Sequence, residues 1–118
     1  MTPKAVEAFA LSLPGAQLSI KWGDHRTFVV ADKMFAMLSG PNGPKELSFK
    51  CSDIAFELLT QQEGVSPAPY MQRMKWVRLA TLSTLPPDEI RARLREAHRI
   101  IVEKLPKKTR GLYLPERA

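Results

Sequence analysis

The chain has 118 residues, of which 44% are hydrophobic and 25% are charged, and its formal net charge is +6. This length suits one domain with one core, and the composition excludes a disordered chain. We therefore predict a single domain over residues 1–118.

Two features predict a cytoplasmic protein. No apolar run approaches the roughly 20 residues of a membrane-spanning helix, and Glu7 interrupts the apolar stretch near the amino terminus that a signal peptide would need. The single cysteine, Cys51, cannot form an internal disulfide, which fits a reducing compartment. We expect no association with a membrane.

Positive charge is concentrated in the second half of the chain. Residues 1–64 hold six Lys/Arg against seven Asp/Glu, a net of −1, whereas residues 65–118 hold twelve against five, a net of +7. A basic surface on one side suggests a polyanion partner such as nucleic acid, although net charge also simply aids solubility.

The first half of the chain predicts one helix followed by four strands. Thr2 and Pro3 are typical of a helix start, and Pro14-Gly15 ends the helical pattern. Short turns at Gly23-Asp24 and Asp32-Lys33, and a hairpin tip at residues 40–44, would make the strands antiparallel. Alternation of apolar and polar residues places these strands at residues 16–22, 28–30, 33–38 and 46–50.

The second half predicts a helix, one strand and a long helix. Ser52 caps a helix at residues 53–62, and two prolines make residues 65–70 irregular. A strand follows at residues 76–82, and Pro106 ends the last helix. The apolar stripe of that helix is Ile90, Leu94, Ala97, Ile101 and Leu105. Helices grouped around an antiparallel run indicate an α+β fold, with a sheet of about five strands and the helices packed on one face.

The residue types that often carry catalysis or bind metals lack the expected neighbours. His25 and His98 have no Cys, His or Asp/Glu at metal-ligand spacing, so we expect ordinary surface or half-buried residues. Cys51 precedes a helix start, which could lower its thiol pKa, but without a neighbouring base a buried, inert thiol is the better expectation. We predict no enzyme, no metal and no cofactor, although a catalytic site assembled from distant residues stays open.

Two basic segments near the carboxyl terminus are candidates for anion contacts. The last helix carries a row that is either an anion-binding edge or a solvated face balanced by carboxylates, namely Arg91, Arg95 and Arg99. A compact basic turn follows Pro106, and it suits phosphate contacts or a solvated tail equally well. Its cations are Lys107, Lys108 and Arg110.

The predicted strand at residues 76–82 and the residues just before it contribute further candidates for contacts with nucleic acid. Trp76 and Arg78 share one face, and Arg73 and Lys75 alternate to the other side. An aromatic ring beside guanidinium groups can stack on bases, whereas a tryptophan in a small domain is more often a core anchor. Lys50, on the polar face of another strand, would extend the basic surface.

Several short motifs, spread over about residues 3–114, together resemble the MmcQ/YjbR family. They are Leu13-Pro14-Gly15-Ala16, Trp22-Gly23, Lys33-Met34-Phe35-Ala36, Leu47-Ser48-Phe49-Lys50, Gly64-Val65, Pro67-Ala68-Pro69-Tyr70, Trp76-Val77 and Leu105-Pro106-Lys107-Lys108. The resemblance implies a CyaY-like α+β fold and a DNA-binding protein of the double-wing type. Many relatives carry Asn and His where this chain has Gln72 and Lys75, and the additional lysine favours a phosphate contact.

Residues and resemblance together favour a non-enzymatic module that binds double-stranded DNA. We expect phosphate contacts with weak sequence preference and a log–log salt slope of about −4 to −5. The candidate contact residues are Lys50, Arg73, Lys75, Trp76, Arg78, Lys107, Lys108 and Arg110. The alternative is a protein-binding or small-ligand-binding regulatory module with no nucleic-acid role, in which Trp22 and residues 67–70 line an apolar pocket.

Overall fold

The computed structural model describes residues 1–21, 25–40 and 45–113. Four consecutive strands follow the first helix, and helices and strands alternate after them. In order, the elements are α1 (Pro3–Ser12), β1 (Ala16–Lys21), β2 (His25–Val30), β3 (Lys33–Ser39), β4 (Glu46–Lys50), α2 (Asp53–Leu59), β5 (Val65–Pro67), the 3₁₀ helix η1 (Gln72–Met74), β6 (Trp76–Leu79), α3 (Pro87–Glu103) and α4 (Lys107–Arg110).

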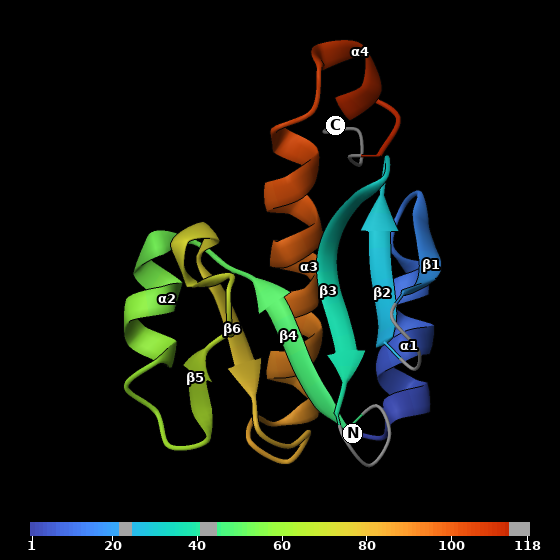
Figure 1. Cartoon of the computed structure of the whole chain (residues 1–118). Helices are drawn as coiled ribbons and strands as arrows, with labels where there is room; N and C mark the ends of the chain where they lie inside the picture. Colours follow the sequence, from blue (N-terminus) through green and yellow to red (C-terminus); the bar gives the residue numbers. More distant parts are fainter. Residues whose placement is uncertain (22–24, 41–44, 114–118) are drawn as a thin grey trace.

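The strands of the described residues form one antiparallel, six-stranded sheet in the order β1-β2-β3-β4-β6-β5 (Figure 1). The first four strands are neighbours in sequence and in space. The last strand, β6, pairs with β4, so β5 lies at the edge. This crossing order places Lys50, at the end of β4, opposite Trp76, at the start of β6.

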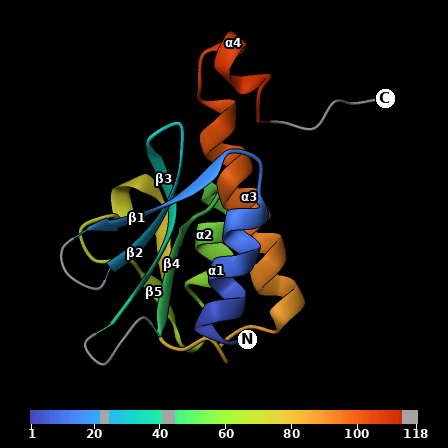
Figure 2. The ribbon, with the colours of Figure 1, turned by 90° about the vertical axis from the view of Figure 1, so that its right-hand side faces the viewer.

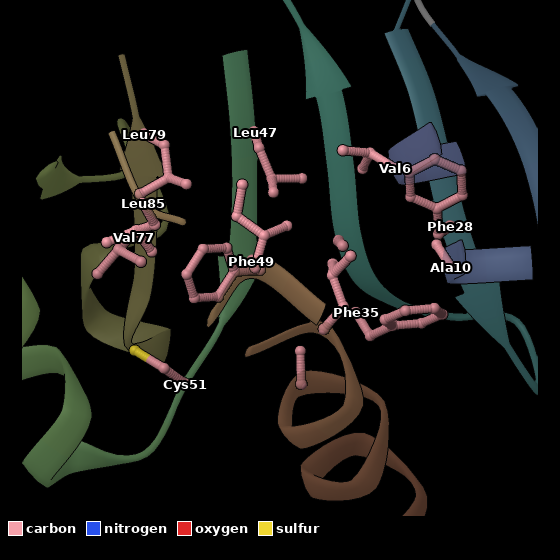
Figure 3. Close-up of a cluster of buried hydrophobic side chains, with 14 of the residues drawn as sticks. Val6, Ala10, Phe28, Phe35, Leu47, Phe49, Cys51, Val77, Leu79 and Leu85 are labelled. Atoms are coloured by element: carbon pink, nitrogen blue, oxygen red, sulfur yellow. The ribbon is translucent and has the colours of Figure 1, made fainter. Parts of the chain in front are cut away.

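Helices α1, α2 and α3 lie on one face of the sheet, as the side view shows (Figure 2). Side chains from these helices and from the inner face of the sheet form one hydrophobic core. Figure 3 shows part of this core, including Val6, Ala10, Phe28, Phe35, Leu47, Phe49, Val77, Leu79 and Leu85. The predicted α+β class, with helices on one face, is confirmed.

The strand count and one turn differ from the predictions. Residues 65–70 are not wholly irregular, because Val65–Pro67 forms β5. A proline is tolerated there because an edge strand leaves one row of backbone groups unpaired. The β2–β3 turn is centred on Ala31 (φ 49°) and Asp32 (φ 63°), since Lys33 already pairs with Val30. The turn predicted at residues 23–24 and most of the predicted tip at residues 40–44 lie outside the described residues.

The predicted apolar stripe of α3 faces the core. Ile90, Leu94 and Ala97 are fully buried, and Ile101 and Leu105 are partly buried and pack against the core. His98 is 4% exposed, in contrast to the surface or half-buried position that we expected. Its Nε2–H donates to the carbonyl oxygen of Pro14 at 2.7 Å. The turn after α1 therefore covers this flank of α3, a contact between residues far apart in sequence.

Candidate functional site

The segment before β6 is a tight loop with an uncommon backbone. Lys75 has a positive φ of 58°, and Tyr70 has one of 65°. Such left-handed conformations cost a non-glycine residue on the order of 1–2 kcal/mol, so surrounding contacts must hold them. The Lys75 N–H donates to the carbonyl of Gln72 at 3.1 Å, and the Lys75 carbonyl accepts the N–H of Cys51 at 2.9 Å. The loop is thereby attached to the end of β4.

Lys50 provides a second attachment of this loop. The residue is 8% exposed, and its Nζ donates a hydrogen bond to the carbonyl oxygen of Met74. Burial lowers the pKa of Lys50, and the nearby positive charge of Lys104 lowers it further. The ammonium is therefore partly desolvated at this position.

Lys50 and the loop form one wall of a pocket with a volume of about 490 Å³. The other walls come from the start of β3, the start of α2 and the last turn of α3. The lining residues are Lys33, Met34, Lys50, Asp53, Arg73, Met74, Lys75, Trp76, Ile101 and Lys104. Five of them are cations and one is a carboxylate, so the formal charge around the pocket is 5 − 1 = +4.

Four of the predicted site residues meet at this pocket, namely Lys50, Arg73, Lys75 and Trp76. Trp76 is only 3% exposed and therefore forms part of the pocket wall rather than an open stacking surface. The Lys75 ammonium lies 4.8 Å from the centre of the Phe56 ring, a cation–π contact that holds the lysine on the α2 side.

Three further predicted residues lie on α4, which follows the pocket residue Lys104 after a short connection. Figure 1 shows α4 beyond the carboxyl-terminal end of α3, at the end of the molecule where the β2–β3 turn also lies. Lys107 and Lys108 are exposed and Arg110 is half-buried. These cations therefore extend the positive end of the molecule past the pocket.

Arg78 and the arginines of α3 are placed differently. Arg78 does not line this pocket, and its guanidinium lies 4.0 Å from a carboxylate oxygen of Glu46. In the predicted row on α3, Arg91 pairs with Asp88 at 2.7 Å and Arg99 with Glu103 at 3.3 Å. Arg95 lies over the ring of Phe9 at 5.3 Å. The row is thus largely the balanced, solvated face that we considered as an alternative.

Lys33 and Lys104 belong to the pocket but were missed in the sequence. Both lie at an element boundary, the first at the start of β3 and the second just after α3. Only the paired order of the strands and the course of α3 bring these boundaries together. One signal in the sequence could have indicated these two residues. Both are charged residues at the end of a predicted element, and such ends can meet at the same side of an antiparallel sheet.

The apolar pocket of the alternative prediction includes Trp22, which lies outside the described residues, so it stays a prediction. Residues 67–70 do not line the cationic pocket. Tyr70 is 98% exposed, so its ring packs against little of the described structure.

The described ranges contain no cluster of three or more His, Cys, Asp or Glu residues that could hold a metal ion. Cys51 is 1% exposed, as expected for a buried thiol, and burial raises its pKa to about 11. None of the helices in residues 1–21, 25–40 and 45–113 is long and apolar enough to cross a membrane.

The fold and the pocket define a small α+β domain with an antiparallel sheet, helices on one face and a cationic pocket at one end. The YjbR family model matches residues 11–100. The chain belongs to the YjbR family, which confirms the resemblance seen in its motifs.

Two solved structures share this fold. A Deinococcus radiodurans protein with a DUF419 domain aligns with a TM-score of 0.85 and 22% identity, over 97% of this chain and 89% of that one. A Pseudomonas syringae protein aligns with a TM-score of 0.69 and 21% identity, over 85% of this chain and 98% of that one. No curated protein matches the chain. At these identities the likeness concerns the fold alone.

Proposed function

We propose that this protein is a cytoplasmic, non-enzymatic module that binds nucleic acid through phosphate contacts at the pocket end of the molecule. The observation that carries this proposal is the charge balance of the pocket, where five cations face the single carboxylate of Asp53. A concave surface lined by one sign of charge raises the local concentration of oppositely charged ligands. The phosphate backbone of a nucleic acid is a common cellular ligand of this kind.

The cations of the pocket differ from several arginines elsewhere in the described structure, which form ion pairs. The ion pairs among the described residues involve Arg26, Arg78, Arg91, Arg93 and Arg99. None of the five pocket cations takes part in one of these ion pairs, so the positive charge of the pocket is less neutralised than that of the paired arginines. Lys107 and Lys108 on α4 are likewise exposed and outside those ion pairs.

Double-stranded DNA is the partner that we propose. The exposed rim of the pocket and α4 would contact phosphates of the backbone, which position a duplex without reading its sequence. Four to six such contacts correspond to a log–log salt slope of about −4 to −5 and to weak sequence preference.

The alternative of a regulatory module with an apolar pocket and no positive surface is supported less well, because the pocket found here is cationic. A non-enzymatic role is favoured by the placement of the two strongest candidate groups for catalysis. The thiol of Cys51 is buried with its pKa raised to about 11, and the ring of His98 is buried against Pro14. Neither residue lines the pocket.

A salt titration of binding to an arbitrary duplex tests the proposal. The variant Lys33→Ala/Arg73→Ala/Lys104→Ala removes three exposed cations of the pocket. Its matched control, Lys4→Ala/Lys45→Ala/Arg91→Ala, removes the same charge from the start of α1, the residue before β4 and the first turns of α3.

We expect the pocket variant to bind more weakly, with a slope shallower by about 2 to 3, because each lost phosphate contact changes the slope by about 0.9. The control should keep the wild-type slope. A flat salt dependence of the wild type, or equal losses in the two variants, contradicts the proposal.

A further inference from the structure

The pocket has the size of a small-molecule site. Its volume of about 490 Å³ lies within the range of roughly 300 to 1,000 Å³ that is usual for ligand pockets. A duplex cannot enter such a space, whereas a single nucleotide can. Contacts of a duplex with the rim therefore leave the interior of the pocket without a ligand.

The pocket walls are of two chemical kinds. Four apolar side chains come from β3, η1, β6 and α3, namely Met34, Met74, Trp76 and Ile101. Methionine side chains adapt their shape and make favourable contacts with aromatic rings. The other lining residues are the five cations and Asp53. This composition fits a ligand with a flat, weakly polar part joined to an anionic part.

Lys50 is the residue best placed to bind the anionic part of such a ligand. Its ammonium has three N–H donors, and the carbonyl of Met74 takes one of them. A buried cation with donors to spare gains more from an incoming anion than an exposed one does, because the anion replaces lost hydration. Lys104 lines the same pocket as Lys50, so an anion bound at Lys50 would also be attracted by the charge of Lys104.

We infer that the pocket binds the terminal nucleotide of a nucleic-acid strand, with its phosphomonoester at Lys50 and Lys104 and its base against Met34 and Met74. The inference rests on the proposed function and names the part of the nucleic acid that enters the pocket. A terminal phosphomonoester carries a charge of about −1.5 to −2 at pH 7, more than a phosphodiester within a strand. A net positive pocket with a buried lysine should favour the more highly charged group.

Binding to three DNA ligands of one sequence tests this inference. They are a covalently closed dumbbell without ends, a duplex with an overhanging strand that ends in a phosphate, and the same duplex with a hydroxyl at that end. We expect the phosphorylated end to bind about tenfold or more tightly than the other two, as charge-assisted hydrogen bonds to one additional charge imply. A free nucleoside monophosphate should compete for this added affinity, whereas the nucleoside and inorganic phosphate should compete weakly.

Two pocket variants and one control locate the effect. Lys50→Met should remove the preference for the phosphorylated end, and Lys45→Met, a charge removed just before the same strand, should retain it. Lys104→Ala, at an exposed position, should weaken the preference as well, and it serves if Lys50→Met does not fold. Equal affinity for the dumbbell and the phosphorylated end, with a steep salt slope, overturns the inference and leaves the proposed function intact. Absence of binding to all three ligands overturns both.

Discussion

The ammonium of Lys50 donates a hydrogen bond to the backbone carbonyl of Met74, and this bond joins the end of β4 to the loop that precedes β6. Lys50 therefore has two roles in the structure. It contributes charge to the pocket, and it holds in place the loop that carries Arg73 and Lys75.

The first prediction concerns the structural role of Lys50. Lys50→Met keeps the length of the side chain but removes the hydrogen bond to Met74. We expect a loss of about 1 kcal/mol in the free energy of unfolding, because relief from burying a charge offsets part of the lost bond. Denaturant unfolding measures this loss, with Lys45→Met as the control that should change stability by less than about 0.5 kcal/mol. A loss as small as that of the control would show that the bond does not hold the loop.

The second prediction concerns His98 and pH. Burial lowers the pKa of His98, so the unfolded chain takes up a proton at a higher pH than the folded protein. Folding stability should therefore fall as the pH drops below about 6.5, by at most about 1.4 kcal/mol per pH unit for this group. Unfolding measured between pH 5 and 8 checks the trend. His98→Gln can still donate to Pro14 and should have a flatter profile, and identical profiles would exclude His98 as the cause.

The third prediction concerns the reactivity of Cys51. The thiol is buried, its pKa is raised to about 11, and its Sγ lies 3.3 Å from the carbonyl oxygen of Lys75. Because the thiolate is the reactive form, we expect a thiol reagent at pH 8 to label the native protein at least about a hundredfold more slowly than the denatured chain. Rapid labelling of the native protein would mean that the end of β4 opens readily.

The fourth prediction concerns Gly15, which has a φ of +70° and lies under the ring of Tyr113. A Cβ at this position would be 2.2 Å from Cε1 of Tyr113, so Gly15→Ala combines backbone strain with a clash. We expect a destabilisation of about 1–3 kcal/mol and faster tryptic cleavage after Lys107 and Lys108, because Tyr113 follows α4 closely. Gly111→Ala is the control, since its nearest atoms would be 3.8 Å away and its φ is −62°. Unchanged cleavage in Gly15→Ala would show that Tyr113 does not hold α4.

Local patterns in the sequence were sufficient for most of the fold. Period-two alternation identified β4 and β6. The same alternation placed Trp76 and Val77 on opposite faces of the strand, and Val77 belongs to the core. The short strand β5 was missed because two prolines resemble a loop, and only its pairing with β6 at the sheet edge makes it a strand.

The candidate site could be predicted only in part, because it depends on contacts between distant residues. The sequence predicted a surface or half-buried position for His98, yet its ring is buried and bonded to the carbonyl of Pro14, 84 residues earlier in the chain. Lys33 and Lys104 join Lys50 only because β3, β4 and α3 begin or end beside one another in space. Composition gave the excess of positive charge but could not say which cations stay unpaired.

The most direct test of a phosphate-binding site at this end of the molecule is an NMR titration of the protein with a short DNA duplex whose overhanging strand ends in a phosphate. We predict that amide and side-chain shifts change at Lys33, Lys50, residues 73–76 and residues 104–110, and that these changes diminish as salt is added. Changes centred on α1 or β1, or no changes at low salt, would contradict the claim that the cations at this end form one phosphate-binding site.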